Sequence, residues 1–70
     1  MNKQKLPKHI IAFESKGYLG GVLLVNKNTD LCSVYNPTMH SKKDLRWKVK
    51  HLLSGNGSDD KNIRGKQIVF

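Results

Sequence analysis

Short apolar runs separated by polar turns fill the first half of the chain and predict three strands. The run at 9–13 is rich in isoleucine, and the run at 22–25 is uninterrupted, as in a strand covered on both faces. The polar segment 26–30 predicts a hairpin turn between the second and third strands. In the third run, 31–35, apolar and polar residues alternate. This alternation places Leu31, Ser33 and Tyr35 on one face of the strand and Cys32 and Val34 on the other.

Residues 42–54 form the clearest predicted element, a helix. Ser41 and Asp44 have the spacing of a capping box, and Gly55 stands where a C-terminal cap belongs. Four apolar residues with the spacing i, i+4, i+7 and i+8 form one stripe that faces the core. They are Leu45, Val49, Leu52 and Leu53. The segment 63–70 predicts a final strand, with Ile68 and Phe70 on one face and Val69 on the other.

The order of elements is therefore strand, strand, strand, helix, strand. It predicts an α+β fold in which a small antiparallel sheet of three to four strands packs one amphipathic helix on one face. We expect residues 9–70 to form this single domain and residues 1–8 to be a basic N-terminal arm, or a frayed end without a role. The sheet residues expected to be buried with the helix stripe are Ile11, Phe13, Val22, Leu24 and Val34.

The length and composition favour a binding module. Seventy residues allow one domain, and 37% hydrophobic residues are enough for a folded chain. The core of so short a chain is marginal and leaves few apolar side chains to shape a catalytic cavity, so we expect no enzymatic activity. The single cysteine, Cys32, provides no intramolecular disulfide, and no signal segment or membrane span is recognisable. We therefore expect a cytoplasmic protein without a membrane partner.

The histidines do not have the spacing of a metal site. His40 and His51 are eleven residues apart in the sequence and Cys32 stands alone, whereas structural zinc needs four ligands, usually in close pairs. We expect no metal and no cofactor. His40 or His51 could serve as a general base in RNA cleavage, but nothing in their spacing singles out either residue.

The balance of charges indicates a polyanionic partner. Thirteen Lys and Arg residues stand against five Asp and Glu residues, which gives a formal net charge of +8. So large an excess produces a positive field over much of a small surface and speeds association with polyanions. Solubility alone is achieved by surfaces of mixed sign, without such an imbalance.

The polar side of the predicted helix carries a tryptophan among cations. Trp47 lies about 200° from Leu45 at 100° per residue, with Lys43 four residues before it and Lys50 three residues after it. An aromatic ring in this setting can stack on a base or a sugar while lysines meet phosphates. The alternative is that the ring folds back on Tyr18, Tyr35 or the C-terminal segment, with lysine stems across it.

Two families share limited features with the chain. The element order resembles the small DNA-binding domain of plant ethylene-response factors and some homing endonucleases, but the arginine- and tryptophan-rich strands that read bases there are absent. The stretch from Asn36 through His40 to Leu53 is similar to HicA-type mRNA interferases, where a strand runs through a Pro/His segment into a basic helix. The active-site histidine of that family follows a glycine early in the sheet, and residues 17–21 here contain none. We assign the chain to neither family.

These observations predict a non-enzymatic nucleic-acid-binding protein, with duplex DNA slightly favoured over RNA because a helix can enter the major groove. The predicted binding residues are Lys42, Lys43, Arg46, Trp47, Lys48, Lys50 and His51 in the helix and Lys3 and Lys5 in the arm. The alternative is a small protein-binding inhibitor or adaptor, such as phages or mobile elements encode, that docks on an acidic surface of a partner protein. Formation of a homodimer also stays open, since pairing would enlarge a small core.

Overall fold

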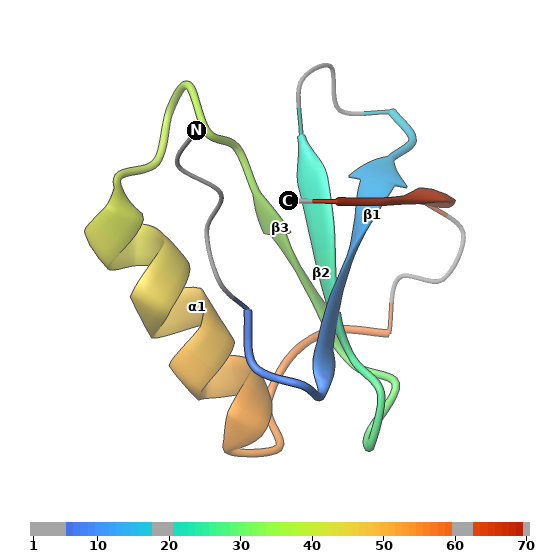
Figure 1. The fold of residues 1–70 in the computed structure, drawn as a ribbon, viewed down its shortest axis with the longest axis vertical. Helices are drawn as coiled ribbons and strands as arrows, with labels where there is room; N and C mark the ends of the chain where they lie inside the picture. Colours follow the sequence, from blue (N-terminus) through green and yellow to red (C-terminus); the bar gives the residue numbers. More distant parts are fainter. Residues whose placement is uncertain (1–5, 18–20, 60–62, 70) are drawn as a thin grey trace.

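The architecture is a four-stranded antiparallel sheet with one helix (Figure 1). The computed structural model describes residues 6–17, 21–59 and 63–69. In chain order the elements are β1 (Ile10–Ser15), β2 (Val22–Asn26), β3 (Cys32–Tyr35), α1 (Lys42–Leu53) and β4 (Arg64–Ile68). The strands lie in the order β3-β2-β1-β4. The predicted α+β class and the predicted order of elements are confirmed.

The helix begins and ends where the sequence predicts, within one residue. The Ser41 side chain accepts a hydrogen bond from the Asp44 amide, and the Asp44 carboxylate accepts one from the Ser41 amide, which completes the capping box. After Leu53 the backbone passes through Ser54 to Gly55, whose φ of 90° suits a residue without Cβ. Among the described residues, no helix is long and apolar enough to cross a membrane.

One face of the sheet packs against α1. The buried residues of this cluster are Ile10, Ala12, Val22, Leu24, Tyr35, Leu45 and Leu52. The predicted alternation of β3 is confirmed, because Leu31 and Tyr35 belong to the helix side, whereas Cys32 and Val34 belong to the opposite side.

Part of the predicted core is wrong. Phe13 and Val34 pack on the face away from the helix, and the pairing of Ile11 with Val25 places Ile11 on that face too. Leu53 is 46% exposed and Val49 is only half-buried. The strand residues are on the other face because of the pairing of β1 with β2, which turns Ile10 and Ala12 towards the helix instead of Ile11 and Phe13. The helix packs mainly against β2 and β3, so Leu53 lies at the margin of the packed face.

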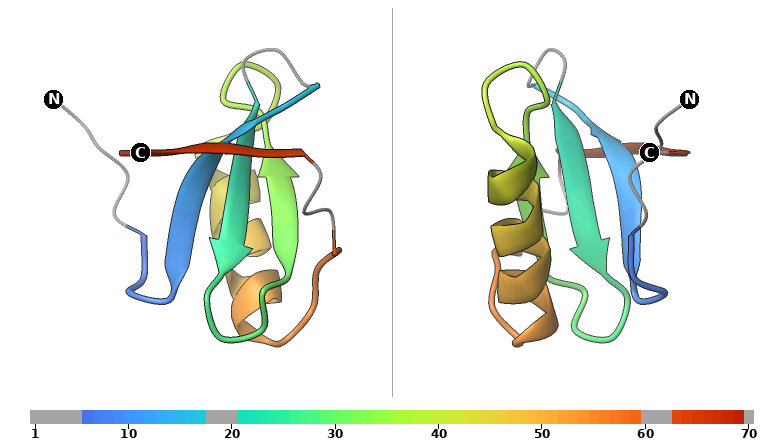
Figure 2. Two further views of the ribbon diagram at one scale, coloured as in Figure 1. Left: turned by 90° about the vertical axis from the view of Figure 1, so that its right-hand side faces the viewer. Right: turned by 60° about the vertical axis from the view of Figure 1, so that its left-hand side comes forward.

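The opposite face of the sheet has its own apolar cluster. Leu23, Val25 and Cys32 are buried there, and Phe13, Val34 and Ile63 pack around them. The pairing of β4 with β1 is irregular between Phe13 and Ser15, where the sheet bends. As a result β4 runs crosswise to the other strands on the side away from the helix (Figure 2).

An arginine fixes the start of β4 on this second face. The Arg64 guanidinium lies 3.0 Å from Asp30 Oδ1 and 5.2 Å from the centre of the Phe13 ring. It thereby joins β4 to the hairpin between β2 and β3 and to β1. The second cluster is closed by one partly buried ion pair and one cation–π contact.

The segment after the helix closes on the free edge of β3. Backbone hydrogen bonds run from the Cys32 amide to the Ser58 carbonyl (2.8 Å) and from the Ser58 amide to the Cys32 carbonyl (2.9 Å). A Cβ at Gly57 would lie 2.9 Å from Leu52 Cδ2 and 3.1 Å from the Cys32 carbonyl oxygen. Only glycine fits so close to the helix end and the strand at a φ of 141°.

A buried asparagine joins the β2–β3 hairpin to the end of the helix. Asn26 is 2% exposed, and its Nδ2 donates to the Leu52 carbonyl at 2.8 Å. Its Oδ1 accepts from the Asn28 amide at 2.9 Å, which shapes the turn. One side chain therefore fixes both the hairpin turn and the position of the C-terminal end of α1.

Replacing this asparagine should destabilise the protein. We expect Asn26→Ala to lower the free energy of unfolding by about 1–3 kcal/mol, because two buried or partly buried hydrogen bonds are lost. Urea unfolding followed by circular dichroism measures the change. Asn28→Ala is the control, since its exposed side chain should matter by no more than about 0.5 kcal/mol. Equal losses in the two variants would contradict the role given to Asn26.

Candidate functional site

The outer surface of α1 is strongly basic. Five of the chain's thirteen Lys and Arg residues lie within the twelve residues of this helix. Lys42, Lys43, Arg46 and Lys50 are exposed, whereas Lys48 is half-buried. Within the part of the chain that the structure describes, none of these five cations forms an ion pair with a carboxylate. Their charges are therefore available to an external anion.

The one acidic residue of the helix is occupied by capping. Asp44 Oδ2 lies 2.9 Å from the Ser41 amide and 3.2 Å from Ser41 Oγ. The hydrogen bond from the Ser41 amide is the main cause that lowers the pKa of Asp44, with smaller contributions from Ser41 Oγ and from the charges of His40 and Lys48. The Asp44 carboxylate is thus ionised at neutral pH and held at the N-terminal end, away from the last two turns.

Trp47 projects from the basic surface, as its helical phase predicts. The side chain is 61% exposed, and its ring stacks on His51, one turn later, with ring centres 4.9 Å apart and planes inclined by 13°. Together with Lys50 and Ser54 these two rings border a shallow hollow of about 220 Å³. We call it the Trp47 hollow. The ring is held by a neighbour on its own helix and remains open to solvent.

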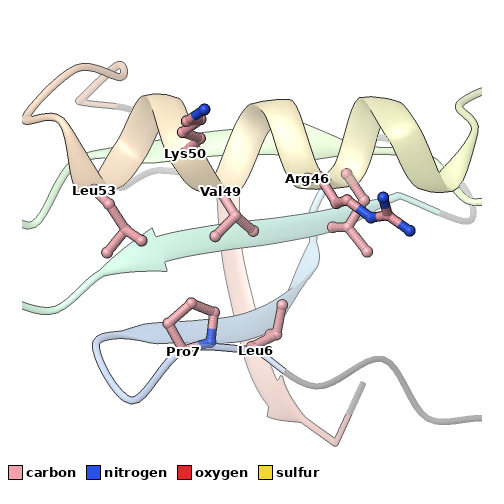
Figure 3. Close-up of a pocket in the computed structure, with 7 residues that line it drawn as sticks. Leu6, Pro7, Arg46, Val49, Lys50 and Leu53 are labelled. Carbon is pink, nitrogen blue, oxygen red and sulfur yellow. The ribbon is translucent and has the colours of Figure 1, made fainter.

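A second, more apolar depression lies between the helix and the segment that precedes β1. Its volume is about 310 Å³ (Figure 3). The residues that line it are Leu6, Pro7, Leu45, Arg46, Val49, Lys50 and Leu53. Leu6 and Pro7 face Val49 and Leu53 across the gap, while the side chain of Lys50 points away from it along the rim. We call this depression the apolar groove.

The apolar groove was not predicted from the sequence. Its helix wall consists of Val49 and Leu53, which the periodicity assigned to the core. One feature of the sequence could have indicated that Leu53 is exposed. It lies at the edge of the apolar stripe, next to Arg46 in helical phase. Whether such an edge residue is covered depends on where the helix lies on the sheet, which the pattern does not contain.

The predicted binding residues do not all lie together. Lys50 borders both the Trp47 hollow and the apolar groove, while Arg46 lines only the groove. Lys48 is half-buried and close enough to Asp44 to lower the pKa of that carboxyl. Lys3 and Lys5 lie outside the described residues.

The structure gives His40 a local role. Its Nδ1 accepts a hydrogen bond from the Asn36 amide at 2.9 Å, and its ring lies 5.8 Å from that of Tyr35. These contacts hold the connection from β3 to the capping box. Across residues 6–17, 21–59 and 63–69, no three His, Cys, Asp or Glu side chains gather as metal ligands would.

Comparisons with protein-family models, curated proteins and solved structures gave no match. The functional argument therefore depends on the side chains of this chain and on their geometry.

The exposure of Trp47 leads to a stability prediction. We expect Trp47→Ala to change the free energy of unfolding by less than about 1 kcal/mol, because the ring contacts mainly His51 and solvent. Leu45→Ala is the matched truncation on the buried side of the same helix and should cost about 2–5 kcal/mol. Thermal unfolding of the two variants measures both effects. A loss of about 3–5 kcal/mol for Trp47→Ala would mean that the ring is part of the core.

Proposed function

We propose that this protein binds nucleic acid through the outer surface of α1 and has no enzymatic activity of its own. In this role Lys43, Arg46 and Lys50 neutralise phosphates, and Trp47 contacts a base or a sugar. The proposal includes a cytoplasmic location, where a chain with one cysteine needs no disulfide framework. The proposed ligand is either DNA or RNA.

One observation carries the proposal. The helix presents exposed cations without carboxylate partners among the described residues, around an aromatic side chain that the core does not use. Like charges at i, i+4 spacing, such as Arg46 and Lys50, destabilise an isolated helix. An arrangement of this kind is explained by a bound polyanion, since phosphates would remove the repulsion.

A salt titration tests the phosphate contacts. We expect the triple variant Lys43→Ala, Arg46→Ala, Lys50→Ala to reduce the slope of log K against log salt by about 0.9 for each duplex phosphate contact that is lost. Fluorescence anisotropy of a labelled oligonucleotide, measured over a series of salt concentrations, gives the slope. The control variant removes the same charge from other exposed positions, namely Lys16, Lys27 and Lys66.

The comparison between the two triple variants is decisive because their net charges are equal. If both variants reduce the slope equally, binding depends only on the net charge of the protein, which is +8 before substitution. The location of the cations on α1 would then make no difference. An unchanged slope in the helix variant would move the binding surface elsewhere on the protein.

The apolar groove favours a second candidate function, a protein-binding adaptor. A partner segment that carries an apolar side chain flanked by carboxylates would complement the apolar walls and the cations Arg46 and Lys50. None of the described residues that line the groove is acidic. A second copy of this chain fits less well, since both groove rims would bring positive charge.

A designed peptide tests the groove. We expect an acidic amphipathic peptide to shift the methyl resonances of Leu6, Val49 and Leu53 in NMR spectra, and Leu53→Glu to weaken its binding about tenfold by removing apolar contact and adding repulsion. The matched control is the same peptide with lysine at each glutamate position. Equal binding of both peptides, or shifts confined to residues outside the groove, would exclude this candidate.

A further inference from the structure

The Trp47 ring is supported by a neighbouring ring on the same helix. His51 stacks on it at 4.9 Å between ring centres and 13° between planes, so one side of the indole is supported by the helix itself. The remaining surface of the side chain accounts for its 61% exposure. A ring supported in this way loses little conformational freedom when a second flat group stacks on it.

The surroundings of the ring suit a single planar group with a negative charge nearby. The Trp47 hollow measures about 220 Å³, below the roughly 300–1,000 Å³ of pockets for drug-sized ligands. Lys50 borders it, and the exposed Lys43 lies one helical turn before Trp47. Lysines before and after an aromatic residue on one helix suit a nucleic-acid strand, which carries a phosphate on either side of each base.

The face of a base is available only when the base is unpaired. In a duplex each base is stacked between its neighbours, and the grooves present base edges. An indole has one hydrogen-bond donor and no acceptor, so it is poorly suited to recognise base edges by hydrogen bonds. Its large flat face is suited to stacking, which a base in a regular duplex does not offer.

We propose that the Trp47–His51 pair is a stacking platform for an unpaired base of single-stranded nucleic acid, with the adjacent phosphates at Lys43 and Lys50. This inference rests on the proposed function and narrows it to one class of ligand. It also reverses the preference for duplex DNA that the helix alone suggested.

The chain contains one tryptophan, so its intrinsic fluorescence reports on this site alone. We expect a single-stranded oligonucleotide of about 12 nucleotides, within the usual site sizes of single-strand binders, to quench the emission of Trp47 on binding. Three further ligands are titrated at the same salt concentration: single-stranded RNA of the same sequence, the corresponding DNA duplex and inorganic polyphosphate. Single strands should bind more tightly than the duplex, and polyphosphate should bind with much less quenching.

Substitutions separate stacking from charge. Trp47→Ala should weaken binding of a labelled single strand about 5- to 150-fold, the usual range for one stacked base, and leave duplex binding unchanged. Trp47→Phe keeps a flat ring and should retain most of the affinity for single strands. Met39→Ala removes another exposed apolar side chain, outside the helix, and should have no effect. Circular dichroism of each variant verifies that the helix is intact.

Each failure has a distinct signature. If no nucleic acid binds at any salt concentration, the proposed function fails and the stacking platform fails with it. If nucleic acid binds with the predicted salt slope but Trp47 is not quenched and Trp47→Ala binds normally, only the platform is refuted. If the duplex binds more tightly than the single strand and Trp47→Ala weakens duplex binding, the ring acts as a wedge between base pairs, which overturns the inference.

Discussion

The burial of β2 on both faces is the constraint on which the rest of the structure depends. All five of its residues are buried, and Leu23 and Leu24 have no exposed surface, although they point to opposite sides of the sheet. Residues 6–17, 21–59 and 63–69 contain one helix, and α1 can cover only one of these sides. The other side is closed by the bend in the sheet that brings β4 across it, by Ile63 and by the contact of Arg64 with Phe13. Most of the strongly apolar side chains are committed to these two clusters.

The sequence predicts those elements whose polarity pattern has one interpretation. The alternation in β3 places Tyr35 and Cys32 on opposite faces, and the uninterrupted run in β2 requires cover on both sides; the structure has both features. The run in β1 does not alternate, because Ile10 and Ile11 are both apolar. Its faces are decided by the pairing of Ile10 with Asn26, a long-range contact that leaves no local signal. The crosswise path of β4 depends on an irregularity in its pairing with β1, where three steps along β4, from Arg64 to Gln67, match two steps along β1, from Ser15 to Phe13. Gly65 lies inside this irregularity, and a Cβ there would lie 2.9 Å from the Glu14 carbonyl oxygen.

The same distinction applies to the candidate site. The exposure of Trp47 and the capping role of Asp44 follow from helical phase and spacing, which are local properties. The apolar groove follows from the lateral position of the helix on the sheet. That position is set at one end by the hydrogen bond from Asn26 to the Leu52 carbonyl and by the close approach of Gly57 to Leu52. These contacts join the end of α1 to β2 and to the segment that pairs with β3, and Leu53 remains 46% exposed in the groove opposite Leu6 and Pro7.

The two surfaces of α1 meet at Lys50, which borders both the Trp47 hollow and the apolar groove. Lys50 lies beside both surfaces, although its side chain points away from the apolar groove, so its presence does not determine which ligand is bound. The discrimination comes from the neighbours. Trp47 offers a flat ring to a planar group, whereas Leu53 and Val49 offer aliphatic walls to a side chain. The basic charge of the helix would attract any polyanion, so in the proposed function the preference for an unpaired base depends on the exposed ring of Trp47.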